Sequence, residues 1–506
     1  MSDRTARLRE LSPEQLARLQ ARLQLRQRSA GEARAAGSAS AIPRADRGGE
    51  LPLSFAQERL WFSEHLEPGT ATYNVALVLE VRGPLDVAAL EASFAAIVGR
   101  HEVLRTVYSL GAAGPVQRVL PADGFRLAVE ELSGVPGEAR AAEARRRAAE
   151  EVQRPLDLER GPVIRASLLR LAPESHVLVA VVHHIAFDAA STGVLAGELA
   201  ALYGALAGGR SSPLPELPLQ YGDFAVWQRA RLRGPTLEAQ LAWWRERLAG
   251  APGTLALPDD YAGEVSPFRA ASHPLEISLE LAEALRALSR REGVTLYITL
   301  LAVFKTLLCV WTGEEDVVVG TSASSRQSPE LEPLIGFFVN TFPLRTDLGG
   351  DPTFRELLGR VRESMVGAFA HADVPLEQLA AELHGSGAGS RTPLFQAFFN
   401  LLVAGGEPLS LPGLEVEVRE PALEAIKFDV ELWVTDTGRG VRAVLGYNAA
   451  RFEPATARRM AAELQAVLRE AAADPDRRIS SVSGFPDEER AGLVDDFNDP
   501  LELLPN

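Results

Sequence analysis

Two adjacent histidines and an aspartate are the residues of this chain best suited to chemistry. His183, His184 and Asp188 lie in the stretch HVLVAVVHHIAFDAAS at 176–191. An imidazole titrates near neutral pH, so it can deprotonate or orient a nucleophile, and a nearby carboxylate can fix the loop that holds it. A metal site is the alternative chemistry. No His-x-x-x-His pair and no second cysteine accompany these groups, so we disfavour metal binding.

A covalent nucleophile of the seryl type is missing from the sequence, because no G-x-S-x-G stretch occurs. The histidine pair therefore favours direct acyl transfer between two bound substrates. Adjacent residues of a strand point to opposite faces, so His183 and His184 are not expected to share an environment. We predict that one is structural and that the other is exposed in a cleft, at the end of a buried strand.

Alternating helical and strand patterns must position these groups. They predict two α/β lobes with mixed sheets, joined near residue 225 and meeting across a cleft. Strands are predicted at 73–83, 162–171, 176–184, 273–279, 316–322, 337–345, 395–402, 427–434 and 441–448, and helices at 86–104, 191–208, 280–311, 353–370 and 454–473.

Composition narrows the class of protein. The 506 residues carry a net charge of -16, which argues against nucleic acid or an anionic membrane as the main partner. The single cysteine, Cys309, lies in an apolar helical pattern and cannot form an internal disulfide, so a reducing, cytoplasmic setting is expected. No signal peptide and no apolar run of membrane-spanning length is recognised.

The first fifty residues differ from the rest, with ten arginines and six acidic residues. The stretch LSPEQLARLQARLQ reads as a helix, and the Ala-, Gly- and Ser-rich stretch after it reads as a flexible tether. We expect four parts: a docking helix and tether, a first lobe with the histidine motif, a second lobe, and a linker. Their boundaries are 1–50, 51–225, 226–485 and 486–506.

Several stretches, in order, resemble the motifs of the condensation domains of nonribosomal peptide synthetases. These domains belong to the wider superfamily of chloramphenicol acetyltransferase-like enzymes with a His-His-x-x-x-Asp motif. The resemblance covers roughly residues 50 to 485, and FNDP (Phe497–Pro500) resembles the junction to a following adenylation domain. The stretches are LSFAQERLWF (Leu53–Phe62), RHEVLRT (Arg100–Thr106), HHIAFDAAS (His183–Ser191), YGDFAVWQ (Tyr221–Gln228), IGFFVNTFPLR (Ile335–Arg345), HADVPLE (His371–Glu377) and SRTPLFQ (Ser390–Gln396).

This resemblance implies two acetyltransferase-like lobes in a V-shaped pseudo-dimer around a central tunnel. A donor acyl or peptidyl thioester would enter from an upstream carrier protein, and an aminoacyl thioester from a downstream one. Both would arrive on 4'-phosphopantetheine arms, with no cofactor bound by the domain itself. An adjacent adenylation domain and a monomeric excised domain are expected, with no nucleic acid and no membrane.

The resemblance also assigns residue roles. His184 is the catalytic position, His183 supports the loop, and Asp188 is structural and pairs with an arginine, for which Arg345 is our candidate. An aspartate paired in this way stays ionised and is a poor proton acceptor. Loop amides near Ala189 are candidate donors to an oxyanion. The remaining expectations are a substrate tunnel or loop position for Ala189, Ala190, Ser191 and Asn340, and structural support from Arg59 and Trp61.

The chain departs from the family where Ala189 and Ala190 replace the usual Gly and the frequent Trp after the aspartate. A methyl group there could narrow the acceptor path, since glycine permits closer backbone approach. Epimerisation is disfavoured by the opening motif, and heterocyclisation by the intact histidines. Two further hypotheses stay open: a silent domain that only docks carrier proteins, and a domain that also modifies a residue, for example by dehydration.

Overall fold

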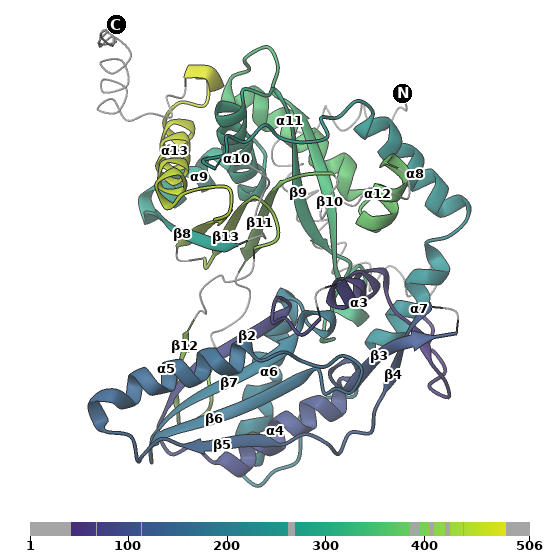
Figure 1. The fold of residues 1–506 in the computed structure, drawn as a ribbon, viewed down its shortest axis with the longest axis vertical. Helices are drawn as coiled ribbons and strands as arrows, with labels where there is room; N and C mark the ends of the chain where they lie inside the picture. Colours follow the sequence, from purple (N-terminus) through teal and green to yellow (C-terminus); the bar gives the residue numbers. More distant parts are fainter. Residues whose placement is uncertain are drawn as a thin grey trace, which may run out of the picture.

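The chain folds into two lobes, each built around its own sheet (Figure 1). The predicted N-terminal helix and most of the tether, and the predicted linker with the FNDP junction, lie outside the described residues. The computed structural model describes residues 42–66, 68–112, 114–261, 269–384, 394–403, 409–419, 426–438 and 440–481.

The first lobe is a five-stranded sheet whose central strand, β7, ends at His183. β2 and β6 flank β7 in antiparallel register. Helices cover both faces of β7, so the strand is buried almost throughout and its run of Val, Leu and Ala fits that position. Alternate residues pack toward α4 and α6 on one face and toward α5 on the other. The elements are β12 (Glu415–Arg419), β2 (Asn74–Arg82), β7 (Ser175–His183), β6 (Ile164–Ala172), β5 (Leu127–Glu131), α4 (Val87–Arg100), α5 (Gly137–Gln153) and α6 (Ala189–Leu206).

Among the described helices, α6 is long and apolar enough to cross a membrane by length and composition. In this fold it is a core helix. Leu195, Leu199 and Leu202, spaced three or four residues apart, form one buried stripe in the first-lobe core, next to α4.

The second lobe is a six-stranded mixed sheet, and its strands confirm the six predicted in the second half of the chain. The predicted helix at 280–311 is two helices, α9 and α10, whose axes differ by 106°. The elements are β10 (Val339–Asp347), β9 (Asp316–Ser324), β11 (Ala397–Val403), β13 (Val430–Asp436), β14 (Val441–Asn448), β8 (Ala270–Ile277), α9 (Leu279–Arg291), α10 (Leu296–Thr312), α11 (Phe354–Phe369), α12 (Leu376–His384) and α13 (Pro454–Ala473).

Two segments of the second half of the chain join the first lobe. β12, which the sequence patterns did not predict, pairs antiparallel with β2. Ile335, Phe337 and Phe338 are buried in the first-lobe core. The boundary expected at residue 225 falls inside α7. The remaining elements are α3 (Phe55–Leu66), α7 (Tyr221–Arg231), α8 (Pro235–Leu248) and a small sheet of β1 (Leu51–Pro52), β4 (Gly114–Val119) and β3 (Thr106–Gly111).

Candidate active site

The histidine loop is a single 3-10 turn, His184–Ala186, between β7 and α6. The His184 amide donates to the carbonyl of Tyr73, the residue just before β2, at 2.7 Å. His183 is buried, and its Nδ1 accepts a hydrogen bond from the Ile185 amide at 3.1 Å. His183 therefore braces the turn, whereas His184 keeps part of its surface exposed.

One hydrogen bond decides the tautomer of His184. Its Nδ1 lies 2.5 Å from the Phe187 carbonyl oxygen, which can only accept. Nδ1 therefore carries the proton, and Nε2 keeps the lone pair that a general base needs. The ring lies against Phe337, with the two ring centroids 4.5 Å apart.

The surroundings keep the His184 imidazole uncharged. Desolvation is the largest cause that lowers its pKa to about 3, followed by the positive charge of Lys427. The hydrogen bond to Phe187 and the charge of Asp188 act in the opposite direction. At neutral pH Nε2 is free to accept a proton or a hydrogen bond, with low intrinsic basicity.

Asp188 holds the two halves of the chain together beneath the loop. Its Oδ1 caps α6 by accepting from the Ser191 amide at 2.9 Å and hydroxyl at 2.7 Å. Its Oδ2 accepts from Arg326 Nη1 at 2.5 Å and from the Phe338 amide at 3.0 Å. Asp188 is buried and accepts from four donors, one of them a guanidinium, so its contacts give it a structural role.

The choice of Arg345 as the partner of Asp188 was wrong. Arg345 donates instead to Asp316, at 3.0 Å from Nε and 2.7 Å from Nη2, near the far ends of β9 and β10. Arg326 is the partner because it lies two residues after the end of β9 and reaches back to the start of α6. The expectation that Asp188 pairs with an arginine is confirmed, but the arginine is Arg326 and not Arg345.

Ser191 and Asn340 have structural surroundings. The Ser191 hydroxyl is buried, donates to Asp188, and contacts both the carbonyl and the amide of Gly336 at 3.0 Å. The Asn340 side chain donates to the carbonyls of Ala372 and Val374 at 2.6 and 2.7 Å. These bonds give both residues a positioning role, so a tunnel-lining role for them is not supported by their contacts.

Ala189 and Ala190 are the first two residues of α6, and both are exposed. The first amides of a helix have no intrahelical acceptor. The two alanines therefore form an exposed helix start immediately after the capping Asp188.

The opening motif supports the histidine loop from α3. Gln57 Nε2 donates to the Ile185 carbonyl at 3.4 Å and to the Tyr108 hydroxyl at 3.1 Å. Trp61 is buried in the first-lobe core. Arg59 reaches across to the second lobe, where Nη1 lies 3.4 Å from the Thr341 hydroxyl and Nε 3.6 Å from Glu377.

Sequence reasoning missed two residues, Arg326 and Lys427. Arg326 lies four residues after the strand predicted at 316–322, and that position alone does not single it out. Lys427 is one of two lysines among 52 basic residues, the other being Lys305. In a chain that uses arginine elsewhere, a lysine is a distinctive choice.

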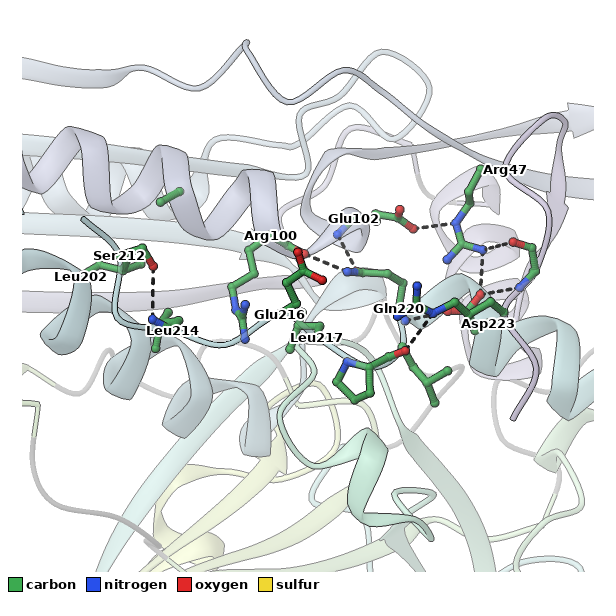
Figure 2. Close-up of a pocket in the computed structure, with 15 residues that line it drawn as sticks. Arg47, Arg100, Glu102, Leu202, Ser212, Leu214, Glu216, Leu217, Gln220 and Asp223 are labelled. Carbon is green, nitrogen blue, oxygen red and sulfur yellow. Dashed lines mark hydrogen bonds and ion pairs between the residues drawn. The ribbon is translucent and has the colours of Figure 1, made fainter. Parts of the chain in front are cut away.

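A cavity of about 590 Å³ lies in the first lobe, away from the histidine loop (Figure 2). It is lined by ion-paired side chains, including Arg47, which bridges Glu102 and Asp223 at 2.8 and 2.7 Å. His184, Asp188 and Arg326 are not among its lining residues. The candidate site therefore rests on the histidine loop and not on this cavity.

The fold and the loop define a condensation domain, and the family comparison agrees. The condensation domain family model matches residues 48–494, so the chain belongs to this family. Members of the family are acyltransferases that form peptide bonds in nonribosomal peptide synthetases.

Individual proteins are similar in sequence to most of this chain. A linear gramicidin synthase subunit of Brevibacillus parabrevis is 41% identical over 452 residues, covering 89% of this chain and 6% of that protein. Phosphinothricin tripeptide synthetase PhsC of Streptomyces viridochromogenes is 39% identical over 489 residues, covering 95% and 44%. This chain thus spans less than half of each of these two relatives. Among solved structures, the X-domain in its complex with OxyB from teicoplanin biosynthesis is 32% identical, with a TM-score of 0.77 and coverage of 89% and 99%.

Proposed function

We propose that this domain joins a donor acyl or peptidyl thioester to the α-amine of an acceptor aminoacyl thioester, inside the cytoplasm. Each substrate is carried on the 4'-phosphopantetheine arm of a carrier protein, upstream for the donor and downstream for the acceptor, with an adenylation domain adjacent. The observation that supports this most directly is His184, whose protonated Nδ1 leaves Nε2 available on a partly exposed ring.

Amide formation from a tethered thioester needs only modest assistance from protein side chains. The acceptor amine attacks the thioester carbonyl, a C–N bond forms, the C–S bond breaks, and the amine proton ends on the departing thiol. Tethering both substrates supplies proximity, which is worth about 7 to 11 kcal/mol in well-oriented cases. His184 accepts a hydrogen bond from the amine through Nε2 and orients its attack, while Asp188 holds the loop.

The direct test uses two separately loaded carrier proteins. Incubated with the domain, they should give a donor–acceptor amide on the downstream carrier, detected by intact-protein mass spectrometry. The mass also reports a dehydrated product. No amide above the rate without enzyme, with several donor and acceptor residues, would overturn the proposal.

A docking-only domain is the second candidate, because the X-domain that resembles this chain was solved in complex with a protein, OxyB. Intact His184 in a braced loop favours catalysis over docking. Binding of carrier proteins without any amide formation would favour docking.

A further inference from the structure

Lys427, from the second lobe, contacts Tyr73, which hydrogen-bonds the histidine loop. It lies just before β13, and its Nζ stands 4.3 Å from the centroid of the Tyr73 ring. Such a distance over an aromatic face is a cation–π contact. The Tyr73 carbonyl is the acceptor of the His184 amide, at 2.7 Å. Tyr73 thus contacts Lys427 through its ring and the histidine loop through its carbonyl.

The ammonium of Lys427 has no carboxylate partner among the described residues. Glu431 is the acid whose charge acts on Lys427, but its oxygens already accept hydrogen bonds from other donors. Oε1 accepts from the amides of Lys427 and Phe428 at 2.5 and 2.9 Å, and Oε2 accepts from Trp433 Nε1 at 2.5 Å. Within the part of the chain that the structure describes, the lysine charge is therefore not neutralised by an ion pair.

The electrostatic surroundings of Lys427 include groups from several elements. Its side chain is exposed, and yet desolvation, followed by the charge of Arg59 on α3, lowers its pKa to about 8, while Glu431 on β13 acts in the opposite direction. Burial is the largest cause that lowers the pKa of His183 and of His184, and the charge of Lys427 adds to it in both.

We propose that Lys427 is an electrostatic residue of acyl transfer: held over Tyr73, its ammonium faces the His184 loop and stabilises the negative charge that develops on the donor carbonyl oxygen. This inference rests on the proposed function. When the amine adds to the thioester, the carbonyl oxygen becomes an oxyanion, and a preoriented cation in a desolvated site stabilises it more than water does. The same charge disfavours protonation of His184 during the reaction.

Three variants test the role, each measured by amide formation between loaded carriers. Lys427→Met should lower kcat at least about tenfold, as removal of an oxyanion donor does. Lys427→Arg keeps the cation and should retain most of the rate at pH 7. Arg419→Met, which removes an exposed cation of β12, should behave as the wild type. Unchanged kcat in folded Lys427→Met would overturn the inference.

The pH dependence separates charge from packing. The lysine loses its proton as pH rises through about 8, whereas arginine stays charged. The ratio of the Lys427→Arg rate to the wild-type rate should therefore increase between about pH 7.5 and 9.5, and effects of pH on the acceptor amine cancel in this ratio. A constant ratio, or a Lys427→Met protein that loses only thermal stability, would assign the lysine to packing and overturn the proposal.

A chemical readout is independent of turnover. Competitive acetylation across a pH series, followed by peptide mass spectrometry, measures the apparent pKa of Lys427, because Lys305 is the only other lysine and is fully buried. Titration near 8 is expected, and titration at the ordinary value of about 10.4 would overturn the desolvated setting. If wild-type enzyme forms no amide, the proposed function fails, and this readout still tests the environment of the lysine.

Discussion

Asp188 and Arg326 form a buried ion pair, 2.5 Å between Oδ2 and Nη1, that links the start of α6 to the segment after β9. The two residues are 138 positions apart in the chain. The same guanidinium lies over the Phe338 ring, 4.2 Å from its centroid. Besides the bonds that the first lobe supplies, the loop that carries His184 is therefore fixed by contacts that only the assembled lobes provide.

Breaking this pair should destabilise the protein strongly. We expect Arg326→Ala to lower the free energy of unfolding by about 3 to 5 kcal/mol, because Asp188 stays buried without its cation. The matched control is Arg345→Ala, whose pair with Asp316 is partly exposed and should cost about 1 kcal/mol or less. Denaturant unfolding measures the free energy of unfolding of both variants. Equal losses for the two would contradict the assignment of Arg326 as the partner of Asp188.

Removing His184 should affect the reaction far more than the fold. His184→Ala is expected to slow amide formation by about 10²- to 10⁴-fold, the usual contribution of a general base or orienting imidazole. Its melting temperature should stay close to that of the wild type, since the ring is partly exposed. His183→Ala, which loses the brace on Ile185, should show the larger thermal loss. A folded His184→Ala enzyme with normal turnover would exclude an essential role.

The low pKa of His184 also predicts a pH dependence. Folding lowers this pKa from 6.5 to about 3, so the unfolded state binds more protons between these values. Stability should therefore fall as pH decreases below about 6.5, and His184→Gln should flatten that fall. Catalysis should show no His184 limb between about pH 5 and 8. The rate of amide formation can also fall at acidic pH because the acceptor amine is protonated. If the midpoint of that fall does not move when the acceptor is replaced by an amine of lower pKa, this prediction is contradicted.

Lys305 should give stability a dependence on alkaline pH. It is fully buried, donates to the carbonyls of Val317 and Leu344 at 3.0 and 2.6 Å, and burial lowers its pKa from 10.5 to about 7. Between about pH 7 and 10.5 the unfolded lysine holds a proton that the folded one lacks, so stability should rise with pH, by at most about 1.4 kcal/mol per pH unit. Lys305→Met removes this contribution. Parallel stability curves for the two proteins would show that burial does not shift Lys305.

Ala189 tests whether the start of α6 borders the substrate path. Ala189→Gly should change the rate only modestly, because the space it opens is offset by backbone freedom that costs about 0.5 to 1 kcal/mol. Ala189→Trp should block amide formation by steric exclusion, with little loss of stability at this exposed position. The assay is amide formation with the same loaded carriers, and full turnover by Ala189→Trp would place this side chain away from the substrates.

The sequence by itself determined the local features of this protein. A run of β-branched residues predicts β7, and the apolar spacing predicts α6, which begins two residues before the predicted start. The alternation of side chains along a strand separated the buried His183 from the more exposed His184. These features depend on neighbours in the chain, so short-range patterns suffice to predict them.

Only the tertiary structure decided which distant residues meet. Two arginines follow or end strands of the second lobe, and nothing in their local sequence shows that Arg326, not Arg345, reaches Asp188. β12 is a short edge strand paired only with β2, and most of its residues are exposed, so its sequence lacks the apolar pattern that predicts strands. Its place beside β2 depends on the passage of the chain from the second lobe back to the first. Lys427 meets Tyr73 for the same reason. Ion pairs and cation contacts form between surfaces that the folded lobes bring together, and chain distance does not encode that geometry.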